Sequence, residues 1–147
     1  MTTKYLIKNV DVSGVISDIA IENELITAIG SNLQVEGATE FDFTGSVALP
    51  GLVDLHTHLR EPGKEDAETV LSGSQAAARG GFTAISAMAN TSPVADTAGV
   101  VEQVYRLGQS AGLVDVFPVG AVTQGIHGEH LAEIGAMADS AARVRVF

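Results

Sequence analysis

Two histidines separated by a single threonine, His56 and His58, follow a short, mostly apolar segment at residues 52–55. Successive side chains of a strand alternate between its two faces, so both imidazoles should project the same way, with Cα atoms about 6–7 Å apart. Imidazoles at that separation can bind one divalent ion, and neutral imidazole suits Zn²⁺ and similar metals. The alternative is a chance pair of histidines at a strand end. A metal site is favoured, because parallel sheets build their active sites at the carboxyl ends of their strands.

Two further polar residues, Arg60 and Asn90, follow the ends of neighbouring predicted strands. The Arg60 guanidinium could hold a substrate carboxylate through two parallel hydrogen bonds, and the alternative is an exposed loop arginine. The Asn90 side chain offers both a donor and an acceptor. It could equally be a turn or capping residue before Pro93, and spacing alone does not separate these alternatives.

A second pair of histidines, His127 and His130, lies on the loop before the third predicted helix. Three-residue spacing on a helix could form a metal-binding face, but Gly128 and the polar neighbours favour a solvated helix start. Glu129 and Glu133 are then explained as carboxylates in the first helical turn, where they interact favourably with the helix dipole.

The elements that would position these residues alternate between strands and helices from Pro50 onward. Gly80–Gly81 ends a first helix, and Gly112 ends a second helix that begins at Asp96 or Thr97. The first helix has Glu65, Asp66 and Glu68 in its first turn, the third is marked by Leu131, Ile134 and Ala138, and strands are predicted at residues 52–55, 83–88, 114–119 and 143–147. This alternation indicates βαβ units on a parallel sheet.

Residues 1–49 have a different texture, with short segments rich in β-branched and aromatic residues and no helical periodicity. Strands are predicted at residues 5–10, 18–21, 25–30 and 40–43, and the middle two form a hairpin. A module this small should not be stable alone. The predicted domains are therefore a β module over residues 1–49 and an α/β part over residues 50–147.

The composition excludes several classes of protein. The 147 residues are 46% hydrophobic and 18% charged, which is too apolar for an intrinsically disordered chain. The formal charge of −10 disfavours binding to nucleic acid or to anionic membrane surfaces. There is no cysteine, and no apolar stretch has the length of a membrane span or a signal-peptide core. A cytoplasmic protein without nucleic-acid or membrane partners is expected.

The segment LPGLVDLHTH at residues 49–58 resembles the metal-binding opening of the amidohydrolase superfamily. Its continuation LREPG at 59–63, with Glu68-Thr69 and MANTSP at 88–93, is similar to the dihydroorotases, in their longer bacterial form. The resemblance covers essentially the whole chain, including the β module. Family members often have proline where Ala89 stands, a difference that should not affect the neighbouring Asn90 side chain.

This resemblance implies both a fold and an activity. The fold would be α/β, with a small β-sandwich module before a metal-dependent (β/α)₈ barrel. Residues 1–49 would be the N-terminal part of that composite sandwich, and residues 50–147 would hold the first three and a half βα units of the barrel. The activity would be zinc-dependent, reversible hydrolysis of dihydroorotate to N-carbamoyl-L-aspartate in pyrimidine synthesis, with one or two Zn²⁺ per active site. His56 and His58 would be metal ligands. Arg60 and Asn90 would hold the substrate α-carboxylate, with His58 lining the same pocket.

The resemblance also implies that essential parts of the enzyme lie outside this sequence. The later metal ligands of the family have no counterpart, and its catalytic aspartate would lie beyond Phe147, so no catalytic residue is assigned within the chain. Because a complete barrel needs about 200–250 residues, we expect an N-terminal fragment that is inactive without its C-terminal part. The expected partners are the small-molecule substrate and that missing part, with a homo-oligomer or aspartate carbamoyltransferase as further candidates.

Two other functions stay open. The chain could belong to another cyclic amidase, acting on hydantoin or allantoin rings, because such enzymes share the histidine pair. The combination of Arg60 and Asn90 favours a substrate that carries a carboxylate. The chain could also be a non-catalytic, dihydroorotase-like scaffolding subunit, although such a subunit has no physical need for these four polar residues.

Overall fold

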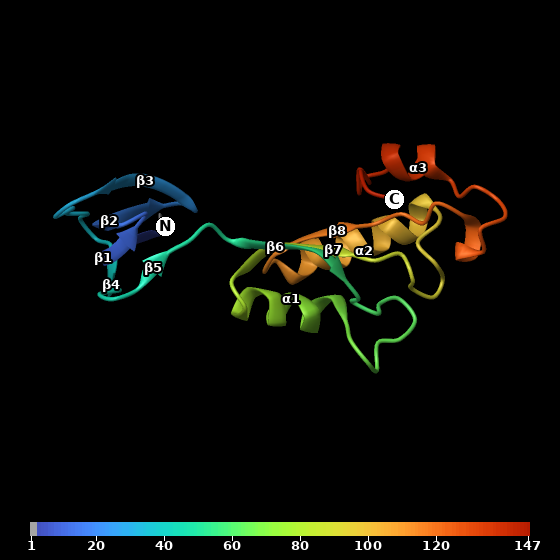
Figure 1. The fold of residues 1–147 in the computed structure, drawn as a ribbon, viewed down its shortest axis with the longest axis horizontal. Helices are drawn as coiled ribbons and strands as arrows, with labels where there is room; N and C mark the ends of the chain where they lie inside the picture. Colours follow the sequence, from blue (N-terminus) through green and yellow to red (C-terminus); the bar gives the residue numbers. More distant parts are fainter. Residues whose placement is uncertain (1–2) are drawn as a thin grey trace. The chain divides into compact units, whose positions relative to one another are not determined.

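The computed structural model describes residues 3–147, and its contacts divide the chain into two units, with the boundary between Pro50 and Gly51 (Figure 1). The first unit contains only strands, whereas the second alternates strands and helices. No helix in residues 3–147 combines the length and the apolar character needed to cross a bilayer.

Five short strands form the first unit. They are β1 (Lys4–Val12), β2 (Val15–Glu22), β3 (Leu25–Gly30), β4 (Thr39–Asp42) and β5 (Val47–Ala48). The order is β3-β2-β1-β4, with antiparallel pairing among the first three strands, while β4 and β5 both run parallel to β1. The predicted hairpin at residues 18–30 is present, and both residues of its Asn23-Glu24 turn have positive φ, which matches the twist of the strands. Within residues 3–50 these strands form a single sheet.

A buried carboxylate, Asp18, ties the strands of the first unit to the loop after β3. Its side chain is 5% exposed and lies 3.0 Å from the Lys8 ammonium. It also accepts hydrogen bonds of 3.0 Å from the backbone N–H groups of Asn9 and Leu33. Asn9 has a positive φ at the point where the β1–β2 register shifts, and Asp18 satisfies its backbone donor there. The Asn9 hydrogen bond outweighs the desolvation of Asp18 and, with the bonds from Lys8 and Leu33, lowers the pKa of this carboxyl.

The second unit has the predicted strand–helix alternation. Its elements are β6 (Leu52–Thr57), α1 (Val70–Arg79), β7 (Phe82–Ala87), α2 (Ala98–Ala111), β8 (Asp115–Pro118), the 3₁₀ turn η1 (Gln124–Ile126) and α3 (Ile134–Asp139). The three strands pair in the order β6-β7-β8 and run parallel, so that their carboxyl ends share one edge of the sheet (Figure 1).

Helices α1 and α2 pack against one face of this sheet. Ile85 of β7 and Val116 of β8 form a core with Val70 of α1 and Val104 of α2, and each of the four side chains is 3% exposed or less. Gly108 allows α2 to lie close to β8, because a Cβ at this position would be 2.5 Å from the Val116 Cβ. Tight helix–sheet packing therefore fixes β7 and β8, the strands from which the next loops extend.

The first helix begins later along the chain than predicted, because the acidic residues expected in its first turn lie before it. The Thr69 hydroxyl accepts a hydrogen bond from the Ser72 backbone N–H, and the Ser72 hydroxyl accepts one from the Thr69 N–H, both at 3.0 Å. This reciprocal capping box starts α1 at Val70, so the three acidic residues lie before its first turn. Among them, Glu65 accepts a 2.7 Å hydrogen bond from the Gly63 N–H, which lowers the pKa of Glu65.

The third helix and the residues after it also differ from the prediction. Helix α3 begins after Glu129 and Glu133, so neither carboxylate lies in its first turn. The predicted fourth strand, from Arg143 to Phe147, does not form. The backbone N–H groups of Arg143 and Val144 instead donate to carbonyls at the end of α3, which removes them from a strand ladder.

Candidate metal and substrate site

The end of β6 departs from regular strand geometry where it carries the histidines. The β6–β7 register shifts between Asp54 and Thr57, and the His56 N–H donates to the Asp54 carboxylate at 2.9 Å. The Thr57 hydroxyl then donates to the Ser86 carbonyl at 2.8 Å, which fixes the strand to β7 again. This register shift is a β-bulge with a hydrogen bond at each end. The sheet therefore determines the position of the histidine pair.

The imidazole rings of His56 and His58 lie together. Their centroids are 5.1 Å apart with an interplanar angle of 67°, and both side chains are exposed. Both line a hollow of about 420 Å³ at the carboxyl end of the sheet, together with Asn90 and apolar residues that include Met88 and Val119. The arrangement brings two nitrogen donors and one amide to a single surface.

The Asn90 side chain contacts the second histidine directly. The distance from Asn90 Oδ1 to His58 Nδ1 is 2.9 Å, although the two residues are 32 positions apart. Asn90 is not a helix cap, because Thr97 occupies the N-cap position of α2. Asn90 therefore joins the histidine pair, whereas sequence spacing left a turn or capping role open.

Phe147 forms an apolar part of the same hollow, which the sequence did not predict. The Gly120 N–H donates to the Val146 carbonyl at 3.0 Å and holds the segment of Phe147 against the loop after β8. The Phe147 ring lies so close to Gly120 that a Cβ there would be 2.7 Å from two ring carbons. The expectation that Phe147 belongs to a strand is therefore wrong, because one hydrogen bond and the fit against a glycine determine its position.

Arg60 lies two residues beyond His58 in a conformation that is uncommon for a residue with a side chain. Its φ is 62°, in the left-handed region. The backbone around it is held by the Lys64 N–H, which donates to the Arg60 carbonyl at 3.0 Å, and by the Glu61 N–H, which donates to the Leu59 carbonyl at 2.8 Å. Within residues 3–147 the half-buried guanidinium makes no hydrogen bond or ion pair.

The loops that carry Arg60 and Asn90 pack against each other. The Ser92 N–H donates to the Pro62 carbonyl at 2.9 Å. Gly63, with a φ of 105°, lies so close to Ser92 that a Cβ would collide with the Ser92 carbonyl oxygen and Cβ. The sequence did not predict this contact, and the glycine in LREPG was the one available signal for it.

The second histidine pair does not join this site as metal ligands. His127 follows η1 and His130 lies on the loop before α3, so the two do not share a helical face. Both are exposed, and the backbone carbonyl of His130 accepts from the Gln124 N–H at 2.9 Å. Their exposure agrees with the predicted solvated position, but the predicted helix start at these histidines is wrong, because α3 begins at Ile134.

The donor set of the site fits part of a metal centre. Two neighbouring imidazoles are the ligands that zinc and similar ions prefer. Within residues 3–147, however, no group of three or more His, Cys, Asp or Glu side chains converges on a common point. His56 and His58 can therefore supply two of the ligands, and a complete coordination shell needs groups from elsewhere.

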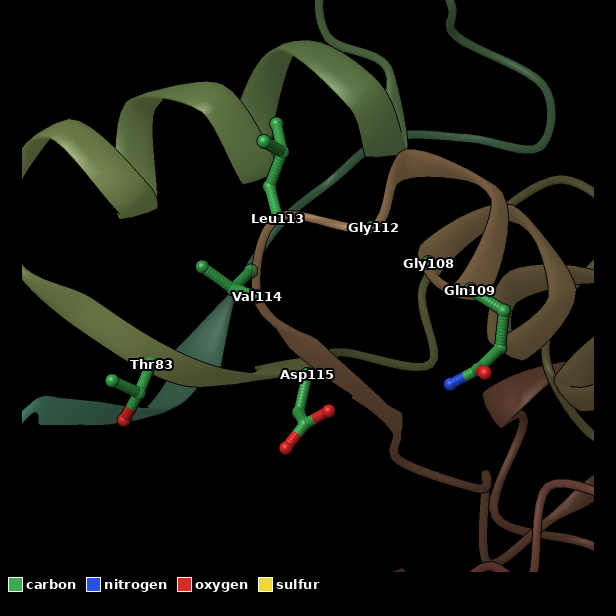
Figure 2. A pocket seen from close by; sticks show the side chains of 7 residues that line it. All are labelled: Thr83, Gly108, Gln109, Gly112, Leu113, Val114 and Asp115. Carbon is green, nitrogen blue, oxygen red and sulfur yellow. The ribbon is translucent and has the colours of Figure 1, made fainter. Parts of the chain in front are cut away.

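A second hollow, of about 300 Å³, lies at the opposite end of the strands (Figure 2). Its lining includes Thr83 near the start of β7 and Asp115 at the start of β8, together with residues at the end of α2. It holds no histidine and one carboxylate, and it lies at the amino ends of the strands. The histidine hollow is therefore the better candidate for a functional site.

Comparison with known proteins identifies the family. A model of the dihydro-orotase-like family matches residues 45–145, which is most of the chain. The chain belongs to this family. The dihydroorotase of Streptomyces coelicolor is 60% identical over 146 residues, covering 99% of this chain and 34% of that protein. The dihydroorotase of Leifsonia xyli subsp. xyli is 64% identical over 131 residues, covering 89% of this chain and 30% of that protein. The chain thus spans about a third of the length of these relatives.

Solved structures of this family's wider fold are similar to the chain. An L-hydantoinase (dihydropyrimidinase) from Arthrobacter aurescens has a TM-score of 0.69 at 24% identity, over 84% of this chain and 28% of that one. A dihydropyrimidinase from Brevibacillus agri NCHU1002 has a TM-score of 0.62 at 30% identity, over 82% of this chain and 28% of that one. The predicted fold class, an incomplete amidohydrolase barrel, is confirmed by these likenesses and by the parallel sheet.

Proposed function

We propose that this chain provides the first part of the active site of a dihydroorotase, which interconverts dihydroorotate and N-carbamoyl-L-aspartate in pyrimidine biosynthesis. The observation that carries the proposal is the cluster of His56, His58 and Asn90 around one hollow, next to the loop of Arg60. The names of the relatives that are 60% and 64% identical support the same activity. The remaining ligands and the catalytic aspartate would come from the part of those relatives' length that this chain does not span.

Zinc is the metal that we propose for the histidine pair. His56 and His58 would hold it through imidazole nitrogens, with one or two ions in the complete site. When bound, the metal would polarise the ring carbonyl and lower the pKa of water at the reaction centre. The two histidines fix where that chemistry takes place, because they are anchored to the sheet through the bulge of β6.

Arg60 and Asn90 would recognise the carboxylate of the substrate. The guanidinium offers a planar pair of N–H donors that matches a carboxylate, and the Asn90 amide nitrogen adds one more donor group. A substrate held at its carboxylate would present its ring to the histidine pair in a fixed orientation, which lowers the entropic part of the barrier. Met88 and Val119, which line the same hollow, would contact the apolar part of the ring.

A second candidate is a cyclic amidase that acts on neutral rings. It is supported by the dihydropyrimidinase structure that is 30% identical with a TM-score of 0.62. The two candidates differ in one chemical demand, because only dihydroorotate carries a carboxylate that Arg60 could bind. Recognition of that group therefore separates them.

The test is a substrate panel on the whole protein that contains this chain. Ring opening of dihydroorotate, dihydrouracil and hydantoin would be measured in parallel with zinc present. We expect turnover of dihydroorotate with at least a hundredfold preference over the two neutral rings. Preferred turnover of a neutral ring would replace the proposal by the second candidate. A folded protein that opens none of the three would favour the non-catalytic scaffolding alternative.

A further inference from the structure

The hydrogen bond between His58 and Asn90 bears on which of the two ring nitrogens of the histidine carries the hydrogen. An amide oxygen can only accept, so with the Asn90 amide oriented as it is in the structure, the contact at Oδ1 pairs with a proton on His58 Nδ1. In a neutral imidazole the other nitrogen, Nε2, then carries the free lone pair. Nε2 is thus the ligating atom that His58 presents, and the contact of 2.9 Å also fixes the rotation of the ring.

The backbone around Asn90 is built to hold the amide in place. On one side, the Met88 N–H donates to the Thr57 carbonyl at 2.9 Å, which joins the end of β7 to the strand of the histidines. On the other side, the Ala95 N–H donates to the Ala89 carbonyl at 3.0 Å and closes the loop after β7. Ala89 itself is 7% exposed. Asn90 therefore projects from a segment that is anchored on both sides.

We propose that Asn90 is a positioning residue for the metal ligand His58 as well as a substrate contact, with its two side-chain polar atoms dividing these tasks. Oδ1 selects the tautomer and orientation of His58, in the way that a carboxylate or carbonyl does beside a metal-bound histidine. Nδ2, which is left free by this arrangement, is the donor for the substrate carboxylate. One amide thereby couples carboxylate binding to the metal centre. The inference rests on the metal site of the proposed function.

The two tasks are separable by substitution in the whole protein. Asn90→Asp keeps an oxygen acceptor for His58 Nδ1 but removes the amide donor and places a negative charge opposite the substrate carboxylate. Asn90→Ala removes both the acceptor and the donor. Gln75→Ala is the matched control, because Gln75 also carries an exposed side-chain amide but lies on α1, outside the hollow. Circular dichroism would show that each variant is folded.

The first readout is zinc affinity, measured by competition with a chelator and without substrate. We expect Asn90→Ala to weaken zinc binding by about 10- to 100-fold, the usual cost of losing such a partner. Asn90→Asp and Gln75→Ala should bind zinc at least as tightly as the original protein. Unchanged zinc affinity in Asn90→Ala, or equal losses in Asn90→Ala and Asn90→Asp, would overturn the proposal.

The second readout is the tautomer of His58, from imidazole ¹⁵N chemical shifts in metal-free protein. We expect a protonated Nδ1 in the original protein and in Asn90→Asp, and a mixture of tautomers in Asn90→Ala. A deprotonated Nδ1 in the original protein would overturn the proposal. Neither readout uses turnover, so a failed substrate panel would leave both tests of Asn90 intact. If the panel shows turnover of dihydroorotate, both Asn90 variants should also raise KM for that substrate.

Discussion

Arg60 combines a left-handed backbone with a guanidinium that has no partner in residues 3–147. For a residue with a Cβ, that backbone region costs about 1–2 kcal/mol, and it persists where neighbouring contacts leave no alternative. The hydrogen bond from the Lys64 N–H to the Arg60 carbonyl, at 3.0 Å, is such a contact, because it closes the loop around Arg60. A backbone held in this way fixes the point at which the Arg60 side chain leaves the chain, two residues after His58.

Replacing Arg60 should therefore affect substrate binding more than folding. In the whole protein, we expect Arg60→Gln to raise KM for dihydroorotate by about 10- to 100-fold, because a charge-assisted hydrogen bond contributes about 1.5–3 kcal/mol. Arg60→Lys should recover only part of this loss, because an ammonium lacks the planar pair of donors. Steady-state kinetics would measure both variants beside Arg79→Gln, an exposed arginine at the end of α1. A KM unchanged in Arg60→Gln would contradict a carboxylate contact.

Asp18 makes a residue-scale prediction about pH and stability. Its pKa is lowered in the folded chain, so the ionised carboxylate stabilises the fold above the ordinary pKa of about 4. This contribution should be lost as pH falls through the folded-state pKa. We expect Asp18→Asn to lower the melting temperature at pH 7, with a difference from the original chain that shrinks below pH 4. Thermal unfolding from pH 7 to pH 3 would measure it, with Glu40→Gln as an exposed control. A difference that stays constant across this range would contradict the assignment.

Individual residues differ in how far the sequence can predict them. The proximity of His56 and His58 followed from strand alternation, because the two lie on one segment. The contact between His58 and Asn90 did not, because it depends on how two loops 32 residues apart are anchored. The positive φ of Arg60 and the position of Phe147 in the hollow could not be predicted either, because no neighbouring residue type indicates them.

At the scale of elements, the site depends on the packing of two loops, one after β6 and one after β7. Gly63 is the point of closest approach, because a Cβ there would collide with Ser92. The Ser92 N–H bond to the Pro62 carbonyl lies beside it. The distance between the loops therefore sets how the side chains of Arg60 and Asn90 are placed relative to one another.

A methyl group at Gly63 should disturb the site as well as the backbone. Gly81 is a matched control, because it also has positive φ, at 80°, but nothing lies within 4 Å of the position that a methyl group would take there. We expect Gly81→Ala to cost about 1 kcal/mol of unfolding free energy with little change in kcat/KM. Gly63→Ala should cost more stability and also lower kcat/KM for dihydroorotate at least tenfold. Equal effects of the two variants on kcat/KM would show that the loop contact does not position the site.

The bounds of helices and strands were predicted well where a single periodic apolar segment determines them. They were predicted less well where side chains form hydrogen bonds with the backbone at a helix end. The strands β7 and β8 and the helix α2, with Gly112 at its end, lie where apolar spacing placed them. The start of α1 was misplaced, because the Thr69–Ser72 capping box overrides the favourable effect of the acidic residues on the helix dipole. Helix α3 is six residues long, too short for periodicity to define its start.

At the scale of the whole molecule, the second unit presents an open sheet. Val53, Leu55 and Phe117 are 57%, 74% and 51% exposed, and a hollow of about 480 Å³ extends over this region. Within residues 3–147, β6 and β8 each pair on one side only. In the relatives, which are about three times as long, further parts of the barrel would cover such surfaces.

The 147-residue chain purified by itself should therefore self-associate through this sheet. Unpaired strand edges and exposed apolar side chains both favour association. We expect size-exclusion chromatography with light scattering to show oligomers, and the double variant Leu55→Thr with Phe117→Thr to shift them toward a monomer. Leu49→Thr is the control, because Leu49 is 76% exposed but lies outside the sheet. A stable monomer of 15.2 kDa for the original chain would contradict this account.

In the proposed function, His56 and His58 form the first part of a zinc site that other residues of a dihydroorotase complete. The most direct test is zinc-dependent hydrolysis of dihydroorotate, measured side by side for the 147-residue chain and the whole protein. We predict no hydrolysis by the chain alone, hydrolysis by the whole protein, and at least a thousandfold loss in its His56→Ala and His58→Ala variants. Hydrolysis by the purified chain at a rate that rises with added zinc, or full activity in both histidine variants, would contradict the claim.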